Sequence, residues 1–205
     1  MNTLPSALHG QRLAVVDVEG NGQQPPEIIE IAILPVDDQP PTEHTMQSWL
    51  IQPAKEITSL VTRKVHGITN EDVAHCPPWR GVAPEIDDAL AGRVLIAHSA
   101  TVEHRVLGAH FPDWNPPLVL DTARLAKHVW PGIGKYGLDA LIEHASLDTS
   151  GISDQRRHRA RFDTWCAWQL FHTLVAESEL GWDALVRAAA LPAFVPPEDT
   201  GGGLW

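Results

Sequence analysis

The sequence predicts an α/β fold built on a mixed, five-stranded sheet. Three apolar, β-branched runs near residues 13–22, 27–36 and 45–51 follow one another with only short turns between them, which is typical of an antiparallel meander. Two further apolar runs, 93–99 and 117–122, alternate with helical stretches, and this alternation predicts parallel crossover units. The 205 residues fit one such domain and can bury a core without disulfides or a structural metal.

The first predicted strand, LAVVDVEGNG at residues 13–22, ends in two carboxylates. Asp17 and Glu19 are two residues apart, and side chains alternate along a strand, so both acids should lie on one face of the sheet. Such a pair also arises by chance, and an exposed acidic edge deters sheet aggregation. The spacing alone therefore leaves a functional and a structural interpretation open.

Helices are expected to cover this sheet. Helical periodicity recurs between the later strands and continues after Thr122, and Gly, Pro or Asp-Ser residues separate the helical stretches. The predicted helices are 57–69, 83–92, 101–111, 122–130, 137–147, 158–177 and 181–190. Residues 192–205 are rich in proline, glycine and acids, so we expect one domain over residues 1–191 followed by a mobile tail over 192–205.

Composition indicates a globular protein from a reducing compartment. No apolar stretch approaches the ~20 residues of a membrane helix, and the N-terminus lacks the basic start and apolar stretch of a signal peptide. The two cysteines, Cys76 and Cys166, are expected to stay thiols in the cytoplasm. A formal charge of −11 argues against broad coating of duplex DNA but leaves a local basic cleft open.

A second candidate acid lies in LIAHSATVEHRVL, residues 95–107, directly after a predicted buried strand. Ser99 or Thr101 can cap the helix that follows, and Glu103 then falls in its first turn. Because an acid in that position complements the helix dipole, Glu103 by itself is equally well explained by structure.

A third candidate region is the helix predicted from residue 158. Asp163 follows His158 by five residues and lies beside an apolar stripe, so it either pairs with a nearby arginine or serves a metal. The basic run of Arg156, Arg157, Arg159 and Arg161 is either a solvated helix start or a surface that attracts phosphate. Its closeness to His158 favours the second interpretation.

Taken together, these segments offer a cluster of carboxylates and one histidine. Hard divalent cations such as Mg²⁺ and Mn²⁺ prefer carboxylate oxygens and leave positions open to phosphate. Two such ions can activate water for phosphodiester hydrolysis, and a histidine near neutrality can take the proton of that water. The residues therefore predict a metal-dependent phosphodiesterase with His158 as the general base.

The order of the segments resembles the DEDDh branch of the DnaQ-like 3′-to-5′ exonucleases, whose motifs are a DxE strand, an HNxxFD-like segment and an HxxxxD helix. The matching stretches here are VVDVEGNG, AHSATVEHRVL and HRARFD, supported by PEIIEIAIL, VHGIT, VLDTARLAKHVWPG and YGLDALIEHASL. The resemblance covers roughly residues 12–175, and its last portion looks most like small bacterial exonuclease X proteins. It implies a ribonuclease H-like mixed sheet, with a three-strand meander and two parallel strands flanked by helices.

The resemblance also implies roles for individual residues. The metal ligands would be Asp17, Glu19, Glu103 and Asp163, and these four would form the catalytic set with His158. The substrate-binding residues would be Gly20, Asn21, His66, His98 and Ser99, although Gly20 is equally well explained as a turn and His66 as a helix cap. The sequence departs from the family pattern at Glu103, usually aspartate, and at Ser99, usually asparagine.

The expected function is removal of nucleotides from the 3′ end of single-stranded DNA or short RNA, with release of nucleoside monophosphates and two Mg²⁺ or Mn²⁺ ions per site. The alternative is a catalytically weak or inactive exonuclease-like module that binds nucleic acid ends or a polymerase partner. Glu103 motivates this alternative, because its extra methylene shifts a carboxylate by on the order of an ångström. A polymerase or repair partner and a homodimer are both open, and no membrane partner is expected.

Overall fold

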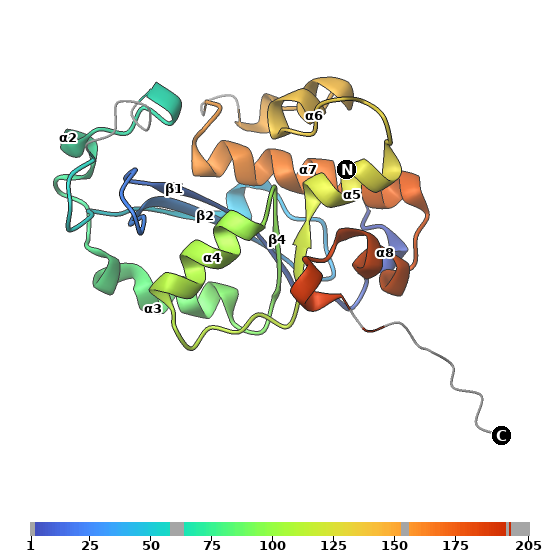
Figure 1. Cartoon of the computed structure of the whole chain (residues 1–205), viewed down its shortest axis with the longest axis horizontal. Coiled ribbons are helices and arrows are strands. Elements are labelled where there is room, and N and C mark those ends of the chain that lie inside the picture. The colour runs from blue at the N-terminus through green and yellow to red at the C-terminus, as the bar shows by residue number, and fades with distance from the viewer. Residues whose placement is uncertain (1–2, 58–63, 153–155, 196, 198–205) are drawn as a thin grey trace.

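A computed structural model describes residues 3–57, 64–152, 156–195 and 197, and its centre is a five-stranded sheet in the order β3-β2-β1-β4-β5 (Figure 1). The strands are β1 (Leu13–Gly20), β2 (Ile28–Val36), β3 (Gln47–Leu50), β4 (Val94–Ala97) and β5 (Val119–Asp121). The first three pair antiparallel, whereas β4 pairs parallel with β1 and with β5. The predicted mixed sheet, a meander followed by two parallel strands, is confirmed.

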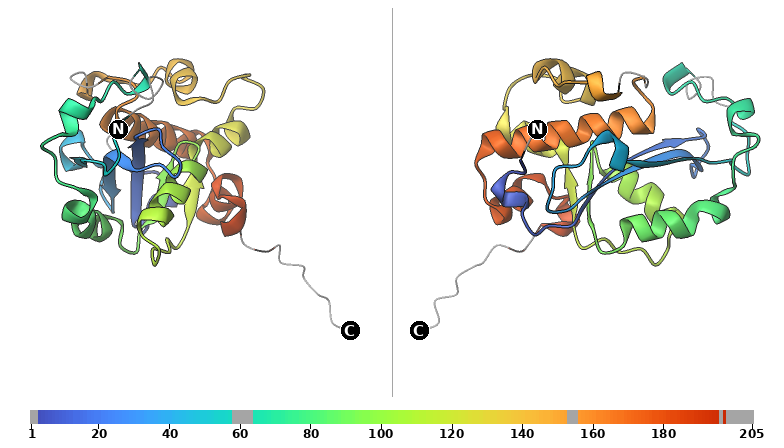
Figure 2. Two further views of the ribbon diagram at one scale, coloured as in Figure 1. Left: turned by 60° about the vertical axis from the view of Figure 1, so that its left-hand side comes forward. Right: turned by 180° about the vertical axis from the view of Figure 1, so that it is seen from behind.

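Helices cover both faces of the sheet (Figure 2). On one face α3 (Trp79–Leu90) and α4 (Thr101–His110) pack against Ala14 and Val16 of β1. On the other face α7 (Ala160–Ser178) packs against Leu13 and Val15. The part of the chain that the structure describes also contains the α-helices α2 (Asn70–Val73), α5 (Thr122–Val129), α6 (Leu138–His144) and α8 (Trp182–Ala189). It contains 3₁₀ turns at Ser6–Leu8, Glu43–Thr45, Ser150–Ile152 and Pro192–Phe194.

The structure differs from the prediction at the starts of α3 and α7 and at the cap of α4. Helix α3 begins at Trp79, four residues before the predicted start, directly after the extended Pro78. Neither Ser99 nor Thr101 caps α4, because Ala100 holds the N-cap position and no side chain bonds there. Helix α7 begins at Ala160, since His158 has a left-handed φ of 59° and cannot belong to a right-handed helix.

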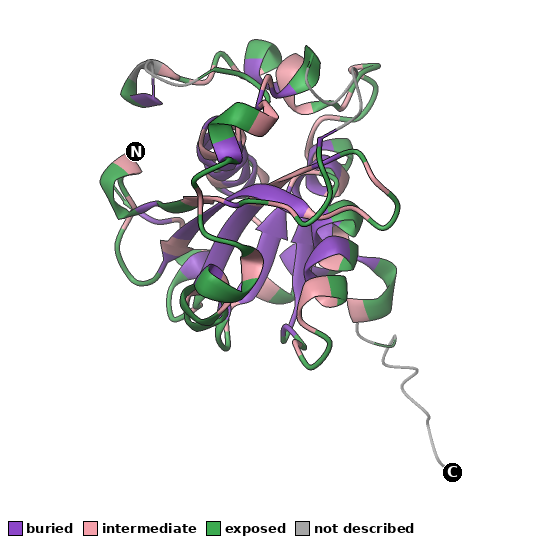
Figure 3. Ribbon diagram, turned by 90° about the vertical axis from the view of Figure 1, so that its left-hand side faces the viewer, coloured by how far each residue is buried: buried purple, intermediate pink, exposed green. Residues whose placement is uncertain are grey.

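Strand β1 leaves the hydrophobic core halfway along its length. Its first four residues are buried, whereas the four from Asp17 to Gly20 are partly exposed (Figure 3). Because β1, β4 and β5 run parallel, their carboxyl ends meet at one edge of the sheet. Polar groups on these strand ends, and on the helices that follow the strands, therefore lie along the same edge of the sheet.

The first residues after the predicted domain boundary at residue 191 pack against α4. Pro192–Phe194 form a 3₁₀ turn, and the Phe194 ring lies 5.4 Å from the ring of His104. The rest of the predicted tail falls almost entirely outside the described residues, as do residues 58–63 of the predicted helix 57–69. Residues 66–69 form a turn and a loop rather than the predicted helix, because Gly67 has a left-handed φ of 69°. Among the described residues, no helix is both long and apolar enough to cross a membrane.

Candidate active site

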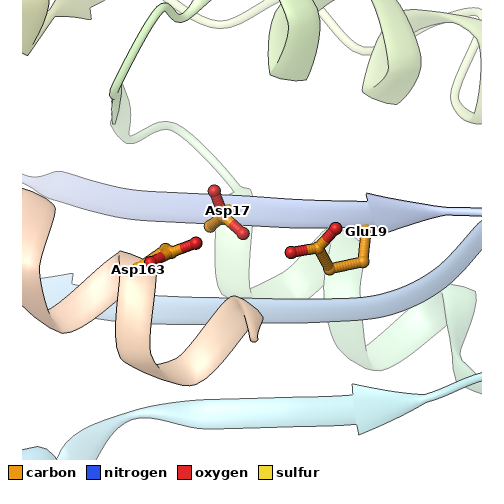
Figure 4. Close-up of side chains that lie close together, drawn as sticks. All are labelled: Asp17, Glu19 and Asp163. Carbon is orange, nitrogen blue, oxygen red and sulfur yellow. The ribbon is translucent and has the colours of Figure 1, made fainter. Parts of the chain in front are cut away.

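Three carboxylates converge where β1 leaves the core. Asp17 and Glu19 lie on the same face of β1, and Asp163 comes from the first turn of α7, which packs on that face (Figure 4). One carboxylate oxygen of each residue lies within 4.8 Å of the other two. The predicted same-face placement of Asp17 and Glu19 thus brings them together with an acid more than 140 positions away in the sequence.

These carboxylates destabilise one another as charges. Burial, followed by repulsion from Asp163, raises the pKa of Asp17 well above its usual value and the pKa of Glu19 to about 8. Burial also raises the pKa of Asp163 to about 6, although the nearby His158 opposes this shift. The Oδ2 atom of Asp17 is buried and accepts no hydrogen bond from the described residues.

This arrangement fits a divalent cation. The donor atoms are carboxylate oxygens, the ligand type that Mg²⁺ and Mn²⁺ prefer. A cation between them would offset the mutual repulsion and would supply the missing partner of Asp17. The three acids are therefore suited to hold a metal ion, and the missing partner of Asp17 is hard to explain as a fold-stabilising feature.

Glu103 lies close to this group but outside the 4.8 Å cluster. It is 5% exposed, and its Oε2 atom is buried without a hydrogen-bond partner among the described residues. Burial raises the pKa of Glu103 to about 8, and its charge in turn raises the pKa of Asp17. A metal-ligand role for Glu103 stays a prediction.

His158 immediately precedes α7 and lies on the solvent side of the acids. Its side chain is 49% exposed, and its charge lowers the pKa of Asp163, which places the ring beside the cluster. Its Nε2 atom is 3.9 Å from Oδ2 of Asp139 on α6. A half-exposed imidazole at the edge of an acidic cluster can take a proton from a water molecule bound there.

Two of the predicted substrate residues shape the turn between β1 and β2. Gly20 sits at a register shift of the β1–β2 pair. Asn21 is fully buried, and its Oδ1 accepts hydrogen bonds from the backbone N–H of Gln23 (3.1 Å) and Glu27 (3.0 Å). The Asn21 side chain therefore organises the turn, and nucleotide contact by the backbone of these residues stays a prediction.

The other three predicted substrate residues have partners within the protein. His66 is buried, its Nδ1 accepts from the Ile68 N–H at 3.1 Å, and the helix cap that follows is Thr69, so His66 is not itself a cap. His98 Nδ1 is hydrogen-bonded to Thr122 Oγ1 at 2.8 Å. Burial lowers the pKa of both His66 and His98, which favours neutral rings. Ser99 is exposed, and its backbone N–H donates to Asp121.

Each arginine of the basic run contacts another part of the protein. The Arg159 guanidinium binds Glu30 with contacts of 2.7 and 2.9 Å, and Arg156 donates to the His66 carbonyl at 3.2 Å. Arg157 pairs with acids of α6, and Arg161 donates to the carbonyls of Glu43 and Met46. Neighbouring carboxylates and carbonyls contact each of these arginines, and a role in drawing in phosphate stays a prediction.

Sequence reasoning missed three acids around the site. Glu30 is buried in β2, and a charge inside the apolar run IIEIAIL was the available signal. Asp121 caps α5 and accepts hydrogen bonds from the N–H groups of Ser99 and Ala123, and its place between a strand and a helix signalled that cap. Asp139 contacts His158 through the tertiary fold alone, so no local pattern marked it.

Comparison with known proteins gives consistent matches. Residues 14–171 match the RNase_T family, which is described as an exonuclease family. The 3′-5′ exonuclease DinG of Bacillus subtilis (strain 168) is 32% identical over 150 residues, 68% of this chain but only 16% of that protein. The DNA polymerase III subunit epsilon of Aquifex aeolicus (strain VF5) is 26% identical over 80% of each chain. A structure of exonuclease X in complex with 5′ overhanging duplex DNA superposes with a TM-score of 0.72 and 27% identity, covering 86% of this chain and 98% of that one.

Proposed function

The chain belongs to the RNase_T exonuclease family and carries a 3′-5′ exonuclease domain of the DEDD class, and from this premise we propose how it acts and on what. It removes nucleotides from the 3′ end of single-stranded DNA or short RNA and releases nucleoside monophosphates. The observation that carries this proposal is the convergence of Asp17, Glu19 and Asp163 within 4.8 Å beside His158.

Each residue of the site has a distinct task in the proposal. Asp17, Glu19 and Asp163 would hold Mg²⁺ or Mn²⁺, two ions per site, and Glu103 would be a fourth ligand. Bound divalent ions supply water activation and stabilise the charge on the leaving oxygen. His158 accepts the proton of the attacking water, whose oxygen bonds to the phosphorus while the bond to the 3′ oxygen of the preceding nucleotide breaks. That 3′ oxygen takes up a proton, and a 5′-monophosphate leaves.

The charges around the site favour a short or single-stranded substrate. The arginines beside His158 are engaged by the protein, and the whole chain carries a formal charge of −11. Fewer phosphate contacts mean a weaker affinity for long duplexes and a shallower dependence of binding on salt. Exonuclease X has been solved with duplex DNA that carries a 5′ overhang, which supports including recessed 3′ ends among the DNA substrates.

A time course with 5′-labelled oligonucleotides tests the proposal. Single-stranded DNA, RNA of the same sequence and a duplex with a 5′ overhang are incubated in Mg²⁺, Mn²⁺ or EDTA. We expect a ladder that shortens from the 3′ end in either metal and is absent in EDTA. Intact oligonucleotides in both metals would overturn the proposal, and internal cuts without a ladder would replace it by endonuclease activity.

A second function, a module that binds nucleic acid ends or a polymerase partner with little turnover, is motivated by Glu103. This acid lies outside the cluster of three, so its role as a ligand depends on reach. Glu103→Asp shortens the side chain by one methylene and separates the two functions. We expect the rate of Glu103→Asp to stay within about 10-fold of the wild type. If the wild type bound oligonucleotides without hydrolysing them and Glu103→Asp hydrolysed them much faster, the binding module would be favoured.

A further inference from the structure

The segment from Arg156 to Arg159, which we call the basic segment, is held by three different parts of the fold. Arg156 Nη2 donates to the carbonyl of His66, 3.2 Å away. Arg157 Nη1 lies 3.4 Å from Asp139 on α6, and Arg159 Nη2 lies 2.7 Å from Glu30 on β2. Successive arginines therefore reach the turn at residue 66, helix α6 and strand β2, with His158 between them.

His158 needs this support because its backbone is strained. Its φ of 59° lies in the left-handed region, which costs a non-glycine residue about 1 kcal/mol or more. Such a conformation persists where the surrounding structure fixes the chain on both sides. Arg157 and Arg159, the immediate neighbours of His158, supply these contacts.

Among the residues that contact the basic segment as described above, Asp139 also lies near the imidazole of His158. Its Oδ1 lies 3.4 Å from Arg157 Nη1, and its Oδ2 lies 3.9 Å from His158 Nε2. At 3.9 Å the second contact is too long for a hydrogen bond, and it becomes an attraction between charges only when the imidazole carries a proton. The charge of His158 also lowers the pKa of Asp163, so the ring lies near that carboxylate as well.

We propose that Asp139 is a positioning residue for His158: it holds the imidazole directly through Nε2 and indirectly through Arg157. The inference rests on the proposed function, in which His158 is the general base. With Nε2 directed at Asp139, Nδ1 is left to accept the proton of the attacking water. The ring then becomes a cation, its attraction to the Asp139 carboxylate strengthens, and the proton passes on to solvent.

The test compares Asp139→Asn with a matched control, Asp183→Asn. Asp139 is the second residue of α6 after Gly137, and Asp183 is the second residue of α8 after Gly181, so both changes remove the same favourable charge from a helix start. We expect Asp139→Asn to lower kcat about 10-fold with KM within about twofold, and Asp183→Asn to leave both unchanged. Asp139→Glu should recover part of kcat, and Glu143→Gln, which loses only an Arg157 contact, should have a small effect.

A double-mutant cycle distinguishes positioning from a structural effect. In a His158→Ala background, Asp139→Asn should change kcat by less than about twofold, because the residue through which Asp139 acts is gone. The same 10-fold loss in both backgrounds would overturn the proposal.

A measurement that needs no activity separates this inference from the exonuclease assignment. The imidazole Cε1–H resonance of His158, identified by its loss in His158→Ala, should shift in Asp139→Asn and not in Asp183→Asn. An unchanged resonance in an active enzyme would refute the contact. An inactive wild type whose resonance does shift would refute the exonuclease proposal and, with it, the catalytic purpose of the contact, while the contact itself would stand.

Discussion

Glu30 on β2 and Glu19 on β1 are paired across the sheet, yet the two acids have opposite surroundings. The Glu30 carboxylate is 4% exposed and accepts hydrogen bonds from Arg159 Nε, Arg159 Nη2 and the Ala160 N–H. Glu19 instead lies beside Asp17 and Asp163. Burial, followed by repulsion from Asp163, raises the pKa of Glu19 to about 8.

The contrast shows that this fold supplies a buried acid, Glu30, with hydrogen-bond donors and a countercharge. Glu30 ties the start of α7 to the sheet, and this tie helps to bring Asp163 to β1. Asp17 lies two strand positions from Glu19, and its Oδ2 is buried without a partner among the described residues. A missing partner beside a fully paired acid indicates that the cluster is kept for a bound cation rather than for stability.

The largest effect should come from removing one charge of the cluster. Asp17→Asn keeps the shape of the side chain but weakens metal binding, so we expect hydrolysis to fall about 1,000-fold or more. Because the mutation also removes an unpartnered charge, the melting temperature of the metal-free protein should rise by about 2 °C or more. Oligonucleotide assays and thermal melts measure both. If Asp17→Asn lost activity because it unfolded, Asp17 would be a structural residue like Glu30 and the contrast between the acidic cluster and Glu30 would be wrong.

The opposite result is expected for the paired acid. Glu30→Gln leaves the Arg159 guanidinium without its carboxylate, and breaking a buried ion pair costs about 3 kcal/mol of the free energy of unfolding. Urea denaturation measures this loss, and Asp183→Asn in an exposed helix turn serves as the reference. A loss below about 1 kcal/mol would mean that Glu30 is not a structural anchor.

The pH dependence of stability provides a smaller test. Glu19 and Glu103 each have a pKa of about 8 in the folded protein, against 4.5 as the ordinary value. Between those values the folded state binds more protons than the unfolded state, so the cluster destabilises the metal-free protein progressively as the pH rises from about 5 to 8. Glu19→Gln removes one of these groups.

In EDTA, the wild type should therefore lose about 2 kcal/mol more than Glu19→Gln over this pH range. Denaturant titrations at pH 5 and pH 8 measure the difference. Equal pH profiles for the two proteins would show that burial and repulsion do not raise the pKa of Glu19 in the metal-free protein.

Much of this architecture was predictable because it depends on local patterns. Strand alternation placed Asp17 and Glu19 on one face, and the change from strands with short turns to alternating strands and helices gave the mixed sheet. The partners of the arginines were not predictable, since Glu30, Asp139 and the His66 carbonyl are 18 to 129 positions away from them in the sequence. Likewise, the left-handed backbone at His158 follows from tertiary contacts and carries no local glycine or turn signal.

The central claim is that the cluster of Asp17, Glu19 and Asp163 holds a divalent cation, and equilibrium binding of Mn²⁺ tests this claim most directly. The electron paramagnetic resonance signal of free Mn²⁺ is followed at pH 7.5 while wild type, Asp17→Asn or Asp183→Asn is added. We predict that the wild type and Asp183→Asn bind Mn²⁺ equally, and that Asp17→Asn binds at least about 10-fold more weakly. Equal affinity of all three proteins would contradict the assignment of this cluster as the metal site.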